Sequence, residues 1–384
     1  MLLSALNAGA HVYSAAPMLT EIEMACVRGL ARAFGLGKAA DGLTMPGGAA
    51  SNTLALQTAL SNNFGGAYRT HGVLGAMDYL TNVGRRGTGA RPALLTSRHA
   101  HFSLQSAAAA AGLGVGAVVQ IECDDYGRMD PAALEQQLKE MSGDAAHPRG
   151  YPFFVNATSG TTVLGSFDNL RAISAICRTY GCWLHVDASW GGAVVFSAQW
   201  RHLLDGVEGA DSLTFNPHKL LCVPQQCSFL LVRDAAALRT HAIEAGYLFH
   251  HNTHDQAAKS LGCGRRSDAL KLYLAWLRYG TNGFGEHINA GISMAHRLRA
   301  LIEADPRLEL GAVAEPQFLQ LCFRPTGDSA RVPAMRDALL REDKYALDFA
   351  PVRGEAYFRI VTHPRVPYAI YEALVQKVAD MAGN

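Results

Sequence analysis

Two short apolar runs, each leading to an ionisable residue, constrain the fold of this chain more than any other feature. Trp183 to Val186 has the length and composition of a buried strand, and it ends on the acid Asp187. A second strand candidate, Ser212 to Phe215, leads through a proline to Lys219. In an open α/β sheet, ligands bind outside the carboxyl ends of parallel strands. An acid and a lysine that leave two such ends can therefore contact one ligand.

One ligand that needs both groups is pyridoxal phosphate. Its aldehyde condenses with a lysine amine, and its ring nitrogen needs a carboxylate partner to stay protonated. Only seven of the 34 basic residues are lysines, which favours Lys219 as the residue that bonds the aldehyde. Asp187 would then face the ring nitrogen. Taken alone, the same two residues are also explained by an Asp that caps a turn and a solvated loop Lys.

The segments around these residues favour the first interpretation. HVDASWGG and NPHK, with the sequence between them, resemble the cofactor site of the group II pyridoxal-phosphate-dependent amino-acid decarboxylases, and are most similar to glutamate and cysteine sulfinate decarboxylases. The resemblance runs from about Ala16 to the C-terminus. It implies an α/β protein of fold type I, as in aspartate aminotransferase, with a mostly parallel sheet in the large domain and a smaller α+β C-terminal domain.

Three parts of the chain are predicted from this resemblance and from the order of the elements. Residues 1–40 form an N-terminal segment, 41–282 the large cofactor-binding domain and 283–384 the small C-terminal domain. Short strands joined by crossover helices predict the parallel sheet. Fold type I sites usually lie at a subunit interface, so the resemblance implies a homodimer with the active site at that interface.

The segment from Thr44 to Asn52 contains two glycines and several small residues directly before a helix candidate. Free backbone N–H groups and the positive end of a helix are what an anion needs. An ordinary capped turn has the same composition. Because family members use similar PGGAxSN segments to bind the cofactor phosphate, the resemblance implies this role for Ala50 and Ser51.

Further contacts with the cofactor are implied by the resemblance. His101 follows the strand candidate 93–96, and a histidine there can lie flat on the pyridine ring, whereas His99 is expected to be an ordinary loop residue. Thr158 is expected beside the cofactor and Ser189 against its face. The other implied cofactor contacts are Asn216, His218 and Gly264, the last of which reaches the partner's phosphate.

One substitution in the expected lid departs from the family. Its members carry a tyrosine there that protonates the carbon from which carbon dioxide has left, and this position falls on His254. A histidine can deliver a proton near neutral pH. Slow delivery would let the quinonoid carbanion react with oxygen or a carbonyl compound instead. His250, His251 and His254 could also bind a metal, but no carboxylate or thiolate cluster supports them, so no metal site is expected.

Arg359 matches the arginine that grips a substrate carboxylate in the glutamate-type members. A guanidinium suits this role because it makes a planar two-point contact with a carboxylate or sulfinate. The alternative is a surface salt bridge, which an exposed position would favour. The catalytic residues expected from the resemblance are Lys219, His101, Asp187 and His254.

The predicted function is decarboxylation of a small acidic L-amino acid, of the glutamate, aspartate or cysteine sulfinate type, through a Lys219 Schiff base and a quinonoid intermediate. Two alternatives stay open. The same scaffold could run decarboxylative oxidation, carbon–carbon bond formation or a non-decarboxylating reaction. A non-enzymatic binding or scaffolding relative is disfavoured because Asp187, His101, His218 and Lys219 are all present.

Composition excludes several other classes of protein. The formal net charge is +1, so no basic field indicates nucleic acid or an anionic membrane as a partner. The eight cysteines show neither CxxC pairs nor the spacing of a disulfide framework or zinc site, as expected of a reduced cytoplasmic enzyme. The uncharged run 103–121 is split by three glycines, which favours a helix and a strand over a membrane span.

Apolar periodicity and turn residues predict the remaining elements. Helices are expected at 21–34, 169–179, 235–242 and 284–304, and strands at 153–155, 228–232, 308–313, 318–323 and 356–362. Segment 63–92 has little periodicity and is expected to be a surface excursion. Relatives carry a further segment ahead of the region that resembles residues 1–17, so we expect either a misassigned start or a more open substrate pocket.

Overall fold

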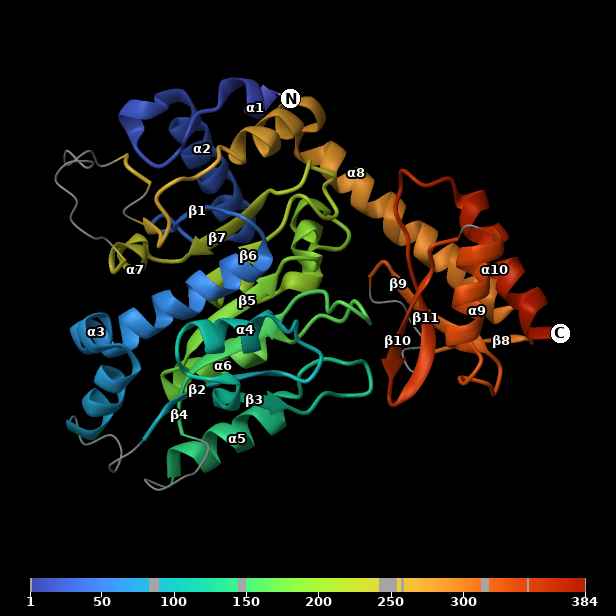
Figure 1. The fold of residues 1–384 in the computed structure, drawn as a ribbon, viewed down its shortest axis with the longest axis horizontal. Helices are drawn as coiled ribbons and strands as arrows, with labels where there is room; N and C mark the ends of the chain where they lie inside the picture. Colours follow the sequence, from blue (N-terminus) through green and yellow to red (C-terminus); the bar gives the residue numbers. More distant parts are fainter. Residues whose placement is uncertain are drawn as a thin grey trace.

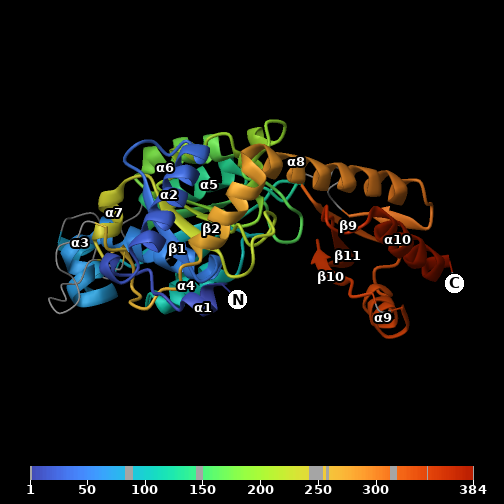
Figure 2. The same cartoon turned by 90° about the horizontal axis from the view of Figure 1, so that it is seen from above.

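The computed structural model describes residues 2–82, 90–143, 150–241, 254–256, 259–311, 318–343 and 345–383. A large α/β part and a smaller C-terminal part are joined by the long helix α8 (Ala269–Glu303), which runs between them (Figures 1 and 2). The proposed domain boundary at 282/283 falls within α8, close to Gly280, where the backbone leaves helical geometry.

A seven-stranded sheet forms the centre of the large part, in the order β1-β7-β6-β5-β4-β2-β3. Neighbouring strands from β3 to β6 are parallel, whereas β7 is antiparallel to both of its neighbours. The mostly parallel sheet agrees with the prediction, and it brings the carboxyl ends of β2, β4, β5 and β6 to one edge. The strands are β1 (Asp41–Met45), β2 (Pro92–Ser97), β3 (Val118–Ile121), β4 (Tyr151–Thr158), β5 (Trp183–Ala188), β6 (Ser212–Phe215) and β7 (Ser228–Val232).

Several helices of the large part begin and end on residues suited to those positions. α2 has Pro17 in its first turn and ends at Gly35, which is left-handed with φ 72°. Asn169 caps α6 by accepting a hydrogen bond from the Ala172 N–H. The helices are α1 (Leu2–Leu6), α2 (Pro17–Phe34), α3 (Gly48–Asn82), α4 (Ser103–Ala110), α5 (Pro131–Gly143), α6 (Leu170–Tyr180) and α7 (Ala235–Arg239).

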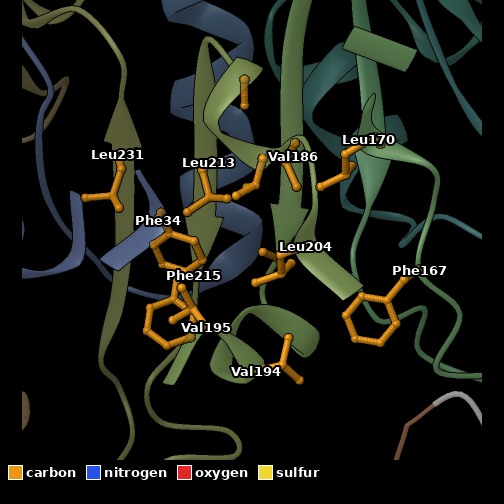
Figure 3. Close-up of a cluster of buried hydrophobic side chains, with 14 of the residues drawn as sticks. Phe34, Phe167, Leu170, Val186, Val194, Val195, Leu204, Leu213, Phe215 and Leu231 are labelled. Atoms are coloured by element: carbon orange, nitrogen blue, oxygen red, sulfur yellow. The ribbon is translucent and has the colours of Figure 1, made fainter. Parts of the chain in front are cut away.

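Helices cover both faces of the sheet, which is why its strands are nearly continuous in apolar residues. Successive residues of β2 point to opposite faces. Leu94 packs in a cluster with residues of α3 and α4, whereas Leu95 packs with residues of α2, α5 and α6. Phe34, Val186 and Phe215 lie in this second cluster (Figure 3).

The C-terminal part is built on a four-stranded antiparallel sheet in the order β10-β11-β9-β8. Buried Phe323 and Phe358 of this sheet share a core with Val375 and Val378 of α10. This is the α+β arrangement that the sequence predicts. The elements are β8 (Leu308–Leu310), β9 (Gln320–Pro325), α9 (Val332–Ala338), β10 (Asp348–Val352), β11 (Glu355–Val361) and α10 (Tyr368–Gly383).

Glycines caused the largest errors in the predicted elements. Segment 63–92 is helical as far as Asn82, because α3 continues past Gly65 and Gly72, where the backbone leaves helical geometry. Each of these breaks shifts the helix face and so removes the periodicity on which the prediction depended. α8 likewise begins at Ala269 instead of 284, since Gly280 interrupts it.

Smaller differences concern strands and the uncharged run. β10 is an additional strand, beyond those predicted from the sequence. It includes Pro351, which sheets tolerate on an edge strand such as this one. β8 ends at Leu310, and residues 312 and 313 of that prediction lie outside the described residues. The run 103–121 forms α4 and β3, as expected. Among the described residues, no helix has the length and hydropathy needed to cross a membrane.

Candidate active site

The carboxyl edge of the parallel strands carries a cavity that is also bordered by the first turn of α3. Asp187 lies near the end of β5, Thr158 ends β4, and Lys219 follows β6. The cavity thus brings together seven of the predicted site residues, from segments far apart in the sequence. Its lining residues are Gly47, Gly48, Ala49, Asn52, His101, Thr158, Gly160, Thr162, Asp187, Ser189, Trp190, Asn216, His218, Lys219 and Gln225.

Asp187 is buried, with 5% of its surface exposed, and each oxygen of its carboxylate accepts a hydrogen bond. Oδ1 accepts the Ser189 N–H at 3.0 Å, and Oδ2 accepts the Asn52 Nδ2 at 2.8 Å. Burial alone would raise the pKa of Asp187. The hydrogen bond from Ser189, the charge of Lys219 and the hydrogen bond from Asn52 instead hold this pKa below its ordinary value. The lowered pKa favours the ionised form of Asp187 at neutral pH.

Lys219 is half-buried in the same cavity. Burial lowers the pKa of its amine, and the negative charge of Asp187 opposes that shift. A lysine whose pKa is lowered by desolvation is a better nucleophile near neutral pH than a solvated one, because more of it is unprotonated. The half-buried position excludes the alternative of a fully solvated loop lysine.

Asn52 and His185 were not predicted as functional residues. The Asn52 amide also donates to Ser103 Oγ at 2.9 Å, and its Oδ1 lies 3.1 Å from His185 Nε2. Burial lowers the pKa of His185 to about 4, so this histidine is neutral. A usable signal existed, because His185 and Asp187 are two residues apart and therefore share one face of a strand.

The first turn of α3 is the predicted phosphate site. Gly47 has φ +119°, and a Cβ at Gly48 would lie 2.7 Å from Ser189 Oγ, so both positions need glycine. Ser51 is buried away from the cavity, donating its hydroxyl to the Gly47 carbonyl at 3.2 Å. Ala50 lines an adjacent pocket together with Gly264. Gly47, Gly48 and Ala49, and not the two predicted residues, line the cavity itself.

Two histidines border the cavity in fixed orientations. His101 Nδ1 accepts the Ser103 N–H at 3.2 Å, and burial lowers its pKa. His218 Nδ1 lies 2.6 Å from the Cys227 carbonyl oxygen and 3.1 Å from its nitrogen. Asn216, which also lines the cavity, accepts the hydroxyl of Ser228 at 2.5 Å. The polar groups of this edge are thus held by the backbone and by one another.

Arg359 lies next to the cavity, whereas His254 does not line it. Half-buried Arg359 donates from Nη1 to the carbonyl of Thr162, a cavity residue, at 2.7 Å. His254 is not among the residues that line the cavity of its own chain. Its Nδ1 lies 3.8 Å from Glu21 Oε1, and its ring centroid is 5.1 Å from that of Tyr13. His250 and His251 lie outside the described residues.

The residues present fit pyridoxal phosphate. Lys219 offers an amine of lowered pKa, and Asp187 offers a carboxylate of lowered pKa in the same cavity. Thr158 Oγ1 is buried in the cavity wall without a hydrogen-bond partner among the described residues, which leaves a polar atom for a ligand. Gly48 keeps the first turn of α3 open where a side chain would fill it.

Comparisons with known proteins agree with this chemistry. The profile of the family described as "Pyridoxal-dependent decarboxylase conserved domain" matches residues 1–326. An L-aspartate decarboxylase of Metarhizium robertsii is 40% identical over 94% of this chain and 72% of its own length. Human cysteine sulfinic acid decarboxylase is 35% identical over 94% of this chain and 74% of its own.

Solved structures show the same relationship. The crystal structure of mouse CSAD superposes with a TM-score of 0.88 and 32% identity, covering 100% of this chain and 80% of the other. The structure described as the glutamate decarboxylase domain of a diaminobutyrate-pyruvate transaminase and L-2,4-diaminobutyrate decarboxylase from Vibrio parahaemolyticus has a TM-score of 0.83 and 26% identity, covering 100% of this chain and 76% of the other. The chain therefore belongs to the pyridoxal-dependent decarboxylase family, with the fold type I architecture, pyridoxal phosphate as cofactor and amino-acid decarboxylation as its activity.

Proposed function

We propose that the substrate is a small acidic L-amino acid, of the aspartate, cysteine sulfinate or glutamate type. The observation that carries this proposal is the guanidinium of Arg359, bonded to the carbonyl of the cavity residue Thr162. A guanidinium at this position offers its remaining N–H groups to an anionic side chain. The similar proteins named for aspartate and cysteine sulfinate support the same substrate class.

Each cavity residue has a proposed role toward the cofactor. Lys219 would hold the aldehyde carbon, Asp187 the ring nitrogen, and the first turn of α3 the phosphate, through backbone N–H groups at a positive helix end. His101 would cover one face of the ring. When bound, pyridoxal phosphate supplies a protonated ring that accepts the electron pair released as carbon dioxide leaves.

The remaining cofactor contacts follow from the cavity wall. We propose that Thr158, Ser189, Asn216 and His218 border the cofactor, as the resemblance implies. Ser51 would act by holding the Gly47 carbonyl and Ser228, so that the turn keeps its shape. Ala50 and Gly264 line the pocket next to the phosphate turn, which suits contact with a second subunit.

Proton return completes the reaction. After carbon dioxide leaves, the substrate α carbon needs a proton, and we propose that a ring nitrogen of His254 delivers it in place of the tyrosine found in relatives. If that step were slow, oxygen or a carbonyl compound would compete for the carbon, which gives the alternative aldehyde or coupled product. The family relationship favours the simple amine.

Substrate choice is tested by incubating the pure holoenzyme with aspartate, cysteine sulfinate, glutamate and an aromatic amino acid. We expect carbon dioxide and amine in equal amounts from at least one acidic substrate, and none from the aromatic one. Carbon dioxide with aldehyde and peroxide would contradict the amine product. Turnover of the aromatic substrate alone would contradict the acidic class.

Arg359 is tested by replacement with methionine. Loss of a hydrogen-bonded charge contact with the substrate costs about 1.5–3 kcal/mol, so kcat/KM for the acidic substrate should fall roughly 10- to 100-fold. Arg299→Met is the matched control, because Arg299 lies on α8, does not line the cavity and pairs with Glu303 of the same helix at 2.9 Å. Equal kcat/KM in the two variants would remove Arg359 from substrate binding.

We further propose a cytoplasmic homodimer with the domain bounds predicted above. All eight cysteines are free thiols in the structure, which suits a reducing compartment. Ala50 and Gly264 lie beside the phosphate turn at the surface pocket where a second subunit would complete the site. Sedimentation of the holoenzyme tests the dimer.

A further inference from the structure

We propose that Cys222, His287 and His363 form a binding site for a divalent transition-metal ion of the zinc type. The three residues come from separate parts of the fold. Cys222 follows Lys219 by one turn, His287 lies on α8, and His363 lies between β11 and α10. This site is distinct from the cofactor cavity, none of whose lining residues belongs to it.

The geometry of the three side chains suits one ion. Cys222 Sγ lies 3.3 Å from His287 Nε2 and 3.0 Å from His363 Nε2. The ligand atoms of all three residues lie within 4.8 Å of one another. Tetrahedral zinc bonds sulfur at about 2.3 Å and nitrogen at about 2.0 Å, which places such donor atoms roughly 3.5 Å apart. The two sulfur–nitrogen distances would therefore have to widen by a few tenths of an ångström to admit the ion.

The donor set is also chemically suited to zinc. One thiolate and two imidazoles are borderline-soft ligands that favour zinc and its neighbours over magnesium or calcium. Binding replaces the thiol proton, which passes to solvent, by a sulfur–metal bond, and no electron is transferred. The described residues add no fourth cysteine, histidine or carboxylate to the group. One coordination position is thus left for water or an exogenous ligand.

Local charges act on these ligands in two ways. Burial lowers the pKa of His287 and of His363, and nearby Arg365 lowers both further. Burial raises the pKa of the Cys222 thiol, while Arg365 opposes this. The positive charge of Arg365 also acts on a bound cation directly, by repelling it.

The backbone of Cys222 and of His363 is held in place by hydrogen bonds. Cys222 has φ +56°, a conformation rarely adopted by residues other than glycine, and its N–H donates to the Lys219 carbonyl at 3.2 Å. The His363 N–H donates to the Tyr371 hydroxyl at 2.8 Å. An ion here would tie the turn that carries Lys219 to α8 and to the C-terminal part.

The competing interpretation is a set of neutral hydrogen bonds. The Cys222 thiol could donate to a histidine or to the Leu220 carbonyl at 3.4 Å. The Arg365 N–H approaches His363 Nδ1 at 3.2 Å, and this contact must open if Nε2 binds a metal, because Nδ1 then carries the proton. Binding measurements distinguish the two states. The sequence did not indicate the site because 65 and 141 residues separate Cys222 from the two histidines.

Cobalt(II) and zinc(II) are the probes for the test. The holoenzyme, with its cofactor, is treated with a chelator, freed of it and titrated with Co²⁺. We expect saturation at one equivalent, with a sulfur-to-cobalt charge-transfer band and the intense visible bands of a four-coordinate ion. Zn²⁺ should displace the cobalt and abolish these bands.

Variants assign the band to these residues. Cys222→Ser should abolish the charge-transfer band. Mutating a residue that only hydrogen-bonds to a metal ligand weakens metal affinity roughly 10- to 100-fold. His363→Gln removes a ligand itself, so the loss of affinity should be larger. Cys123→Ser, at a half-buried cysteine elsewhere, and His296→Gln, on the same helix as His287, should leave both unchanged. His287→Gln provides a third ligand variant should one of the others fail to fold, as judged by cofactor absorbance and circular dichroism.

Two outcomes would overturn the site. One is a titration of the wild type without a saturable charge-transfer band, which leaves the hydrogen-bonded triad as the state of these residues. The other is equal metal binding in all folded ligand variants, which would place the ion elsewhere, such as on the histidines of the expected lid. Neither result bears on decarboxylation, because the readout is metal binding.

Discussion

Asn52 determines how the carboxylate of Asp187 is held, because its amide bonds that carboxylate, Ser103 and His185 at once. We expect Asn52→Ala to leave Asp187 Oδ2 without its 2.8 Å donor. The pKa of Asp187, held low in part by this bond, should then rise. Loss of a hydrogen bond to a charged group predicts a fall in kcat/KM of roughly 10- to 100-fold.

The pH profile distinguishes this effect from a general loss of structure. A raised pKa of Asp187 means that the carboxylate is protonated at a higher pH, so the acid limb of the kcat/KM profile should move to higher pH. Asn63→Ala is the control, since its amide donates to the Ala59 carbonyl of the same helix at 2.9 Å. An acid limb that stays in place in Asn52→Ala would show that Asn52 does not act through Asp187.

Single residues also show which parts of the candidate site can be predicted from the sequence. Asp187 and Lys219 could be identified because each follows a short buried strand within a specific motif, and parallel strands must end at one edge. The strand spacing places His185 on the same face as Asp187, but the contact of Asn52 with both depends on how α3 packs on β5, which no local pattern encodes. The cofactor contact of Ser51 stays a prediction; in the structure its hydroxyl is bonded to Gly47 and Ser228, a contact that the sequence does not indicate.

At the level of elements, the contact between α3 and His241, two residues after the end of α7, predicts part of the pH dependence of stability. Thr58 of α3 lies 2.7 Å from the Nε2 of buried His241. Burial, and then the charge of Arg69, lower the pKa of His241 from 6.5 to about 4. The unfolded chain therefore binds a proton between these values that the folded chain does not. Stability is present above pH 6.5 and is lost as pH falls toward 4.

His241→Gln should remove part of this dependence while keeping a hydrogen-bond partner for Thr58. The separation of the two pKa values corresponds to roughly 3 kcal/mol between pH 7 and pH 4, of the order of 1.4 kcal/mol per pH unit within that range. The measurement is the midpoint of urea denaturation at pH 7.5 and pH 5.5. His202→Gln, at an exposed histidine, is the control. If the urea midpoint falls as much between pH 7.5 and pH 5.5 in His241→Gln as in the wild type, the assignment is contradicted.

Helices and strands could be predicted from the sequence where a single pattern, such as a continuous apolar run, was present. The buried strands β6 and β7 were predicted to the residue because both faces are covered and the apolar run is continuous. α3 and α8 were not, because Gly65, Gly72 and Gly280 rotate the helix face partway along each. The apolar periodicity of the sequence is lost at such a break. The helix nevertheless continues in the structure, because both of its halves pack against the rest of the protein.

At the scale of the whole molecule, the placement of His254 is explained best by two subunits. His254 lies against Glu21 and Tyr13, and the neighbouring Asp255 accepts the Tyr13 N–H at 2.7 Å. These contacts hold it outside the cavity that contains Lys219 of the same chain. We expect His254 to serve the cavity of the partner subunit, which would make the proposed homodimer a requirement for proton return.

Mixed dimers test this expectation directly. Chains carrying Lys219→Ala and His254→Ala are coexpressed with different affinity tags, and the mixed dimer is purified on both. If His254 acts across the interface, the mixed dimer has one complete site, and its activity should be about half that of the wild-type dimer. If His254 acts within its own chain, neither site is complete, and activity should not exceed that of the His254→Ala homodimer. Since the Lys219→Ala homodimer lacks the amine altogether, any gain in the mixed dimer must come from the site that pairs Lys219 of one subunit with His254 of the other.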